Sequence, residues 1–229
     1  SMLKTSRYGE LYAQSIADPN QFWLEQADAV HWFRKPRHAL SPRESICPAW
    51  FAGGKLNTCY LALDHHVVRG RGEQAALIYD SPVTGVKQSF TYRQLRDEVA
   101  RFAGGLRELG VGRGDTVVIY MPMIPQTVVA MLACARIGAI HSVVFGGFAP
   151  HELAIRIDDA RPKVLITASC GKEVDRVIDY LELVNKALDQ AEHPPQQCIV
   201  YKRSFHPGRL HAGRERNWDS LLEAQPAVC

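Results

Sequence analysis

From residue 116 onward, short runs of apolar residues alternate with stretches in which apolar residues recur every three or four positions. The short runs are typical of buried strands, and the three- and four-residue recurrence is typical of amphipathic helices. The pattern predicts strands over 116–121, 140–145, 163–168 and 198–202, and helices over 125–137, 150–160 and about 178–191. Strands that alternate with helices and are apolar throughout indicate an α/β fold, with a mostly parallel sheet covered by helices on both faces.

The segment before residue 116 changes its periodicity twice. Apolar positions at helical spacing over 57–68 give way to two short strands, 75–80 and 87–91, joined by a turn-rich segment and therefore predicted to form a hairpin. Thr91 followed by Gln94 is a capping box, so a long amphipathic helix should begin there and end at Gly110.

The N-terminal third is irregular and rich in aromatic residues. We expect two short helices, 8–17 and 21–30, with Asp18-Pro19 as the break and Asn20 as a possible N-cap. The remainder is rich in Trp, Phe, Pro and Gly, a composition typical of a segment that packs on another domain. We therefore expect a helical and irregular appendage over 1–64 and the α/β part over 65–229.

Composition narrows the function. The 229 residues carry a net charge of only +3, which gives no reason to expect a nucleic-acid or membrane partner. The basic segment 202–217 contains one aromatic residue, Phe205, and is more typical of a solvated loop than of a nucleic-acid surface. Pro122 and Pro125 divide the uncharged stretch 116–135 into a strand and a helix, each too short to cross a bilayer.

The six cysteines form no CxxC pair and no Cys/His cluster at metal-ligand spacing. They are interpreted as reduced thiols. Because no such cluster occurs, no metal site is expected. No secretory signal opens the sequence. These features favour the cytoplasm, or the mitochondrial matrix in a eukaryote.

Several common nucleotide and hydrolase motifs are missing. The glycines at 110, 112 and 114 lead from a helix into a strand, the wrong order for a dinucleotide fingerprint, and neither a Walker P-loop nor a G-x-S-x-G elbow occurs. His65-His66 and Asp158-Asp159 are more readily explained by packing and local ion pairs than by catalysis.

Two loops that follow predicted strands remain as candidates for a site. Phe145-Gly146-Gly147 leads to a helix that Pro150 opens, and 169–176 carries Lys172 and Arg176 beside a glycine. Ligands of open α/β sheets gather at the carboxyl ends of the strands, where both loops should lie. Bare backbone, a helix start and cationic side chains together suit a phosphorylated ligand.

At this point two long runs resemble a known family. They are GKLNTCYLALDHHVVRGRGEQAALIYDSP at 54–82 and YMPMIPQTVVAMLACARIGAIHSVVFGGFAPHELAIRIDDARPKVLITASCG at 120–171. Both resemble the acetyl-CoA and propionyl-CoA synthetases of the adenylate-forming superfamily. Gly171 to Arg176 approaches the pattern of the propionyl branch, whereas Leu61 and His65 depart from the usual pattern.

The resemblance implies an ATP- and Mg²⁺-dependent ligase that joins propionate or acetate to coenzyme A (CoA) through an acyl-adenylate. It implies that 65–229 is the first portion of the AMP-binding domain and stops before the phosphate loop, so no catalytic residue is expected and the isolated chain should be inactive. The residues that the resemblance assigns to CoA are Phe145, Gly146, Gly147, Glu173, Val174, Asp175 and Arg176.

Two other functions stay open. A short protein could bind CoA or a nucleotide without chemistry, or the aromatic N-terminal third could serve an interaction scaffold. The sequence defines no oligomeric state and does not decide between propionate and acetate.

Overall fold

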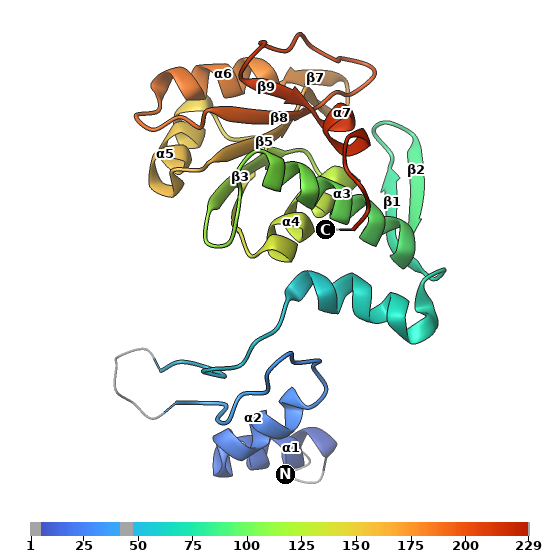
Figure 1. The fold of residues 1–229 in the computed structure, drawn as a ribbon, viewed down its shortest axis with the longest axis vertical. Helices are drawn as coiled ribbons and strands as arrows, with labels where there is room; N and C mark the ends of the chain where they lie inside the picture. The colour runs from blue at the N-terminus through green and yellow to red at the C-terminus, as the bar shows by residue number, and fades with distance from the viewer. Residues whose placement is uncertain (1–5, 42–47, 229) are drawn as a thin grey trace. The chain divides into compact units, whose positions relative to one another are not determined.

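The computed structural model describes residues 6–41 and 48–228. The chain divides into two compact units, Ser1–Asn57 and Thr58–Cys229 (Figure 1). Residues 58–64 thus fold with the second unit. The division into an appendage over 1–64 and an AMP-binding domain over 65–229 stays a prediction.

The first unit begins with two helices, α1 (Arg7–Ala17) and α2 (Pro19–Ala27). Asp18 caps α2, because its carboxylate accepts the Gln21 N–H at 2.9 Å. The prediction of Asn20 as the N-cap is wrong: the Asn20 amide oxygen instead accepts the backbone N–H groups of Ala39 at 2.9 Å and Leu40 at 3.3 Å. Asn20 therefore secures the loop that follows α2.

The second unit opens with a helical segment that contains two π-helical turns, η2 (Tyr60–Asp64) and η3 (Val67–Arg71). The predicted hairpin follows as β1 (Ala75–Ser81) and β2 (Val86–Thr91), which pair antiparallel. The capping box is confirmed, since Thr91 Oγ1 accepts the Gln94 N–H at 3.2 Å and the Gln94 side chain accepts the Thr91 N–H at 2.9 Å. It starts the long helix α3 (Tyr92–Glu108).

A five-stranded sheet forms the centre of this unit, in the order β4-β3-β5-β8-β9. Every pair in it is parallel, which confirms the predicted α/β class. Its strands are β3 (Thr116–Met121), β4 (Ile140–Phe145), β5 (Val164–Ala168), β8 (Gln197–Tyr201) and β9 (Glu215–Asn217). The helices between and after them are α4 (Pro125–Ile137), α5 (Pro150–Ala160), α6 (Tyr180–Gln190) and α7 (Trp218–Glu223).

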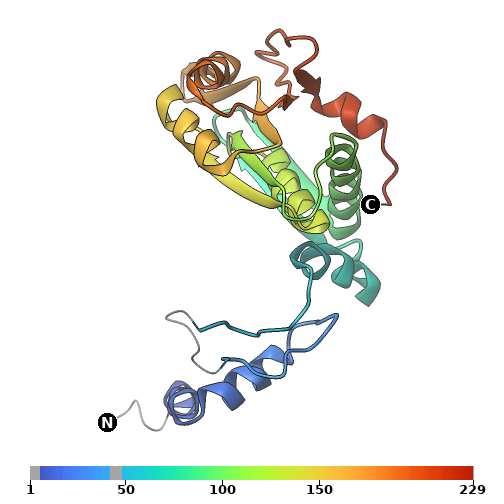
Figure 2. The same cartoon turned by 60° about the vertical axis from the view of Figure 1, so that its left-hand side comes forward.

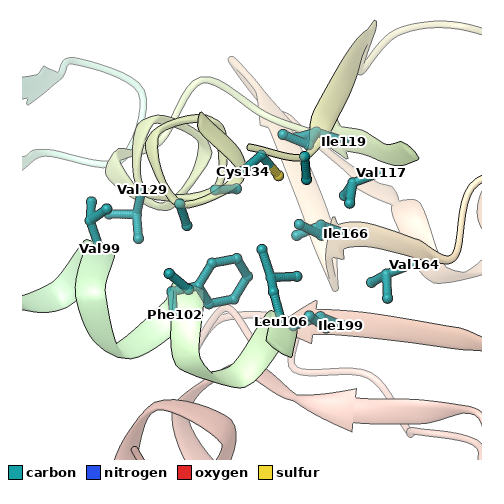
Figure 3. Packing of buried hydrophobic residues seen from close by; sticks show 14 of the residues in the cluster. Val99, Phe102, Leu106, Val117, Ile119, Val129, Cys134, Val164, Ile166 and Ile199 are labelled. Carbon is teal, nitrogen blue, oxygen red and sulfur yellow. The ribbon is translucent and has the colours of Figure 1, made fainter. Parts of the chain in front are cut away.

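Helices cover both faces of the sheet (Figures 1 and 2). One face packs against α3, α4 and α7, where Phe102 of α3, Cys134 of α4 and Ile166 of β5 belong to one buried cluster (Figure 3). The other face packs against α5 and α6 through a second cluster that includes Tyr120 and Leu165. Because neighbouring residues of a strand point to opposite faces, strands buried on both sides must be apolar throughout.

Two features of the second unit were not predicted. The segment 169–176, expected as a loop, is mostly an antiparallel hairpin of β6 (Cys170–Glu173) and β7 (Arg176–Asp179), so α6 starts at Tyr180. The basic segment expected as a loop over 202–217 ends in β9, which adds a fifth strand beside β8. Within the described ranges, no helix combines the length and the apolar character needed to cross a membrane.

Candidate functional site

The carboxyl ends of four parallel strands meet at one edge of the sheet. In the register of the strands, Met121 of β3 lies beside Phe145 of β4, and Ala168 of β5 lies beside Tyr201 of β8. A cavity of about 350 Å³ opens at this edge. Its walls come from the ends of β3 and β4, the β6–β7 hairpin, Arg203 after β8, and the β1–β2 hairpin.

The chain topology explains why a cavity forms here. The chain leaves β3 into α4 on one face of the sheet, whereas it leaves the adjacent β5 toward α6 on the other face. Connections that diverge from neighbouring strands leave a crevice between them, which is the usual ligand position in open α/β sheets. The predicted meeting of the two loops at this edge is borne out by the walls of the cavity, which include Phe145–Gly147 and Gly171–Glu173.

Tyr180, the first residue of α6, lines the cavity and explains two of its glycines. A Cβ at Gly171 would lie 2.6 Å from Tyr180 Cε1, and a Cβ at Gly146 would collide with the Tyr180 hydroxyl oxygen. Both glycines therefore allow a close approach within the protein itself. The sequence suggested close approach to a ligand, and it did not reveal this aromatic partner.

The charged groups at the cavity are Lys172, Glu173 and Arg203 among the described wall residues. The Glu173 carboxylate accepts from the Arg176 guanidinium at 2.9 Å, so its charge is offset by a neighbour. That pairing leaves the cations Lys172 and Arg203 to dominate the potential inside the cavity. An anionic ligand suits this balance.

The remaining predicted site residues lie beside the cavity. Val174 and Asp175 form the two-residue turn of the β6–β7 hairpin, and Arg176 begins β7; none of the three contributes to the wall. Residues of α5 do not contribute either, so its helix start provides no anion contact there. The assignment of 173–176 to CoA stays a prediction.

Burial controls protonation in the cavity wall and the layer behind it. It raises the pKa of Tyr120 to about 12, with the nearby Tyr180 adding to the effect. Burial also raises the pKa of Tyr180, and the Glu173 charge acts in the same direction. Both phenols are therefore neutral at physiological pH and add no negative charge to the site.

The described part of the chain contains no group of three or more His, Cys, Asp or Glu residues that could hold a metal ion. The Mg²⁺ that the resemblance implies therefore has no such ligand set among these residues.

Comparison with known families decides how this architecture is classified. The model of the AMP-binding enzymes matches residues 64–227, and the acetyl-coenzyme A synthetase N-terminus model matches residues 8–62. The chain belongs to the AMP-binding enzyme family. The predicted resemblance is thereby confirmed, and the α/β unit of the chain coincides closely with the first of the two matches.

Individual relatives agree with the family. The chain is 45% identical to the mitochondrial acyl-CoA synthetase short-chain family member 3 of Homo sapiens, covering 98% of this chain and 33% of the relative. It is 42% identical to the propionate–CoA ligase of Escherichia coli (strain K12), covering 93% of this chain and 34% of that one.

A solved structure, the acetoacetyl-CoA synthetase from Streptomyces lividans, superposes with a TM-score of 0.83 at 26% identity, over 96% of this chain and 33% of that one. This likeness supports the assigned fold. The chain spans about a third of the length of the curated relatives that it matches.

Proposed function

We propose that this chain is the first part of an ATP-dependent ligase that joins a short-chain carboxylate, propionate or acetate, to CoA through an acyl-adenylate, releasing AMP and diphosphate. We propose further that the cavity at the carboxyl ends of β3, β4, β5 and β8 binds the nucleotide part of CoA. The catalytic groups would come from sequence outside this chain.

One observation carries the assignment of the cavity to CoA. At a single edge of the sheet, an exposed aromatic residue lines the same cavity as two cations whose charge is not cancelled by Glu173. Phe145 is 70% exposed, and Lys172 and Arg203 line the same cavity. A nucleotide offers a base that stacks on aromatic rings and phosphates that bind cations.

The activation step explains why such an enzyme needs two substrate sites. A carboxylate is a poor electrophile, and AMP is a much better leaving group than oxide. The CoA thiolate must then attack the acyl carbon, so CoA has to be held in a fixed orientation. In this proposal the described residues bind and orient CoA, and they take no part in the transfer of the adenylyl group.

The proposal is tested by incubating the complete protein that carries this sequence with ATP, Mg²⁺, CoA and either propionate or acetate. We expect acyl-CoA, AMP and diphosphate in equal amounts. CoA binding without any acyl-CoA product from either carboxylate would favour a binding module instead. If the protein neither bound CoA nor made a product, both assignments would be overturned.

A further inference from the structure

Arg203 lies two residues after the end of β8, the strand next to β5, and lines the cavity. The sequence assigned it to a solvated basic loop, yet it lines the cavity together with Lys172. Its position follows from the register, because Ala168 at the end of β5 pairs with Tyr201 at the end of β8. The residue that comes two positions later therefore lies at the same edge as the Gly171 loop.

The main chain of Arg203 is fixed by a buried hydroxyl. Ser169 is fully buried, and its Oγ accepts the Arg203 N–H at 2.9 Å while it donates to the His206 carbonyl at 2.6 Å. These two bonds hold the turn 203–206 against the end of β5. Because this turn is already fixed, its main chain loses little further freedom when the side chain binds a ligand.

The guanidinium of Arg203 is also held. It lies 4.6 Å from the centroid of the Phe205 ring, and one of its nitrogens donates to the Cys170 carbonyl at 3.4 Å. Lys172 lies 5.9 Å from the same ring centroid. Two cations that share one aromatic ring beside a cavity repel each other, and an anion placed between them relieves that repulsion.

Arg203 differs from Arg176 in its charge balance. Arg176 pairs with Glu173 and its side chain is 73% exposed, whereas Arg203 makes no ion pair with any acid in residues 6–41 and 48–228. A planar guanidinium with unused donors matches a phosphate better than an ammonium does. Of the two arginines, Arg203 is the one equipped to contact an anion inside the cavity.

We propose that Arg203 binds a phosphate of CoA in this cavity, with Lys172 as the second cation. This inference rests on the proposed function, and it identifies the specific residue that recognises the nucleotide part of CoA. Ser169 and Phe205 position Arg203 and do not themselves contact the phosphate.

The test measures steady-state kinetics of the complete protein with Arg203→Ala and Arg203→Lys. We expect Arg203→Ala to raise KM for CoA about tenfold, as loss of a charged hydrogen bond does, and Arg203→Lys to raise it less. KM for ATP and the carboxylate-dependent exchange of diphosphate into ATP, which needs no CoA, should change by less than about twofold. Arg209→Ala is the matched control, since Arg209 is an exposed arginine of the same loop.

Dephospho-CoA identifies the phosphate. If Arg203→Ala no longer raises KM when dephospho-CoA replaces CoA, Arg203 contacts the 3′-phosphate. If the rise in KM persists, Arg203 contacts the diphosphate. Both results support the inference. An unchanged KM for CoA in Arg203→Ala, or an equal rise for CoA and ATP, would overturn it. A wild-type protein that makes no acyl-CoA would overturn the proposed function, and direct calorimetric titration of CoA into wild type and Arg203→Ala would still decide the role of Arg203.

Discussion

Gly171 lies against the ring of Tyr180 so closely that a Cβ on residue 171 would be 2.6 Å from Tyr180 Cε1. Gly146, from the loop after β4, approaches the hydroxyl end of the same side chain. One aromatic residue thus joins the β4 loop to the β6–β7 hairpin. The shape of the cavity depends on this junction, because all three residues belong to its wall.

Alanine at either glycine should destabilise the second unit, by about 1–3 kcal/mol, because the added methyl group overpacks a closed contact. Tyr180→Phe removes only the hydroxyl. It should therefore restore more of the stability lost in Gly146→Ala than of the stability lost in Gly171→Ala, because the atom nearest to a Cβ at residue 171 is a ring carbon. Urea unfolding of the single and double variants measures this difference, and equal relief of both would contradict the described packing.

Arg176 should influence the cavity through Glu173. Removing Arg176 leaves the Glu173 carboxylate unpaired beside the cavity, where it repels a phosphate, so Arg176→Ala should raise KM for CoA by about two- to threefold. Glu173→Gln in the same chain should abolish that rise. If Arg176 instead contacts CoA directly, the double variant will bind CoA as poorly as Arg176→Ala does.

The ion pair between Asp64 and Arg136 should contribute to stability. The Arg136 guanidinium donates to both Asp64 oxygens, at 2.7 and 3.0 Å, and both side chains are only 17% exposed. Asp64→Asn should lower the free energy of unfolding by about 2 kcal/mol, since it removes the negative charge that faces a largely buried cation. Asp80→Asn breaks the exposed pair with Lys87 and serves as the control, with an expected loss below about 0.5 kcal/mol. Equal losses in the two variants would contradict this account.

Glu98 on α3 should make stability depend on pH. Burial raises its pKa, and the Asp219 charge acts in the same direction. A carboxyl group with a raised pKa in the folded state destabilises the fold when it is ionised. The free energy of unfolding should therefore fall as the pH rises from about 4.3, the pKa in the unfolded state, through the pKa in the folded state. Glu98→Gln should therefore stabilise the chain at pH 7 by roughly 0.5 kcal/mol and have no advantage near pH 3. A gain of the same size at both pH values would contradict the assigned cause.

The central strands of the sheet were predictable because they are buried on both faces. The edge strand β4, in which Ile140, Val143 and Phe145 are exposed, was predictable from its apolar residues. The segments 116–121 and 140–145 were bounded correctly, and so were the helices at 125–137 and 150–160. Proline opens each of these two helices, which gives a clear boundary signal. Continuous apolar character and a marked helix start left little room for another interpretation.

The short strands lacked such signals. β6 and β7 have four residues each and carry charged side chains, and β9 consists of Glu215, Arg216 and Asn217. Backbone pairing with a neighbour places these segments, and hydropathy does not reveal it. The β6–β7 turn also lacks the glycine or asparagine that usually marks a hairpin turn in a sequence. Val174 adopts the positive φ of 28° there instead.

The candidate site was predictable in part. The loop at Phe145 and the segment at Lys172 follow predicted strands, and both reach the cavity. Arg203 also follows a predicted strand, but the sequence did not show that β8 lies next to β5. Only the structure provides the strand order, and the strand order shows which basic residue of this loop lines the cavity.

The most direct test of the central claim is hydrogen–deuterium exchange of the complete protein with and without CoA. We predict that CoA slows exchange at three strand ends, namely 145–147 and 171–173, which line the cavity, and 201–205, which carries the cavity residue Arg203. A second cavity, lined by Leu109, Leu210 and Leu221 among others, provides the internal control and should show no change. Exchange that is unaltered at the three strand ends while CoA is bound would contradict the assignment of this cavity to CoA.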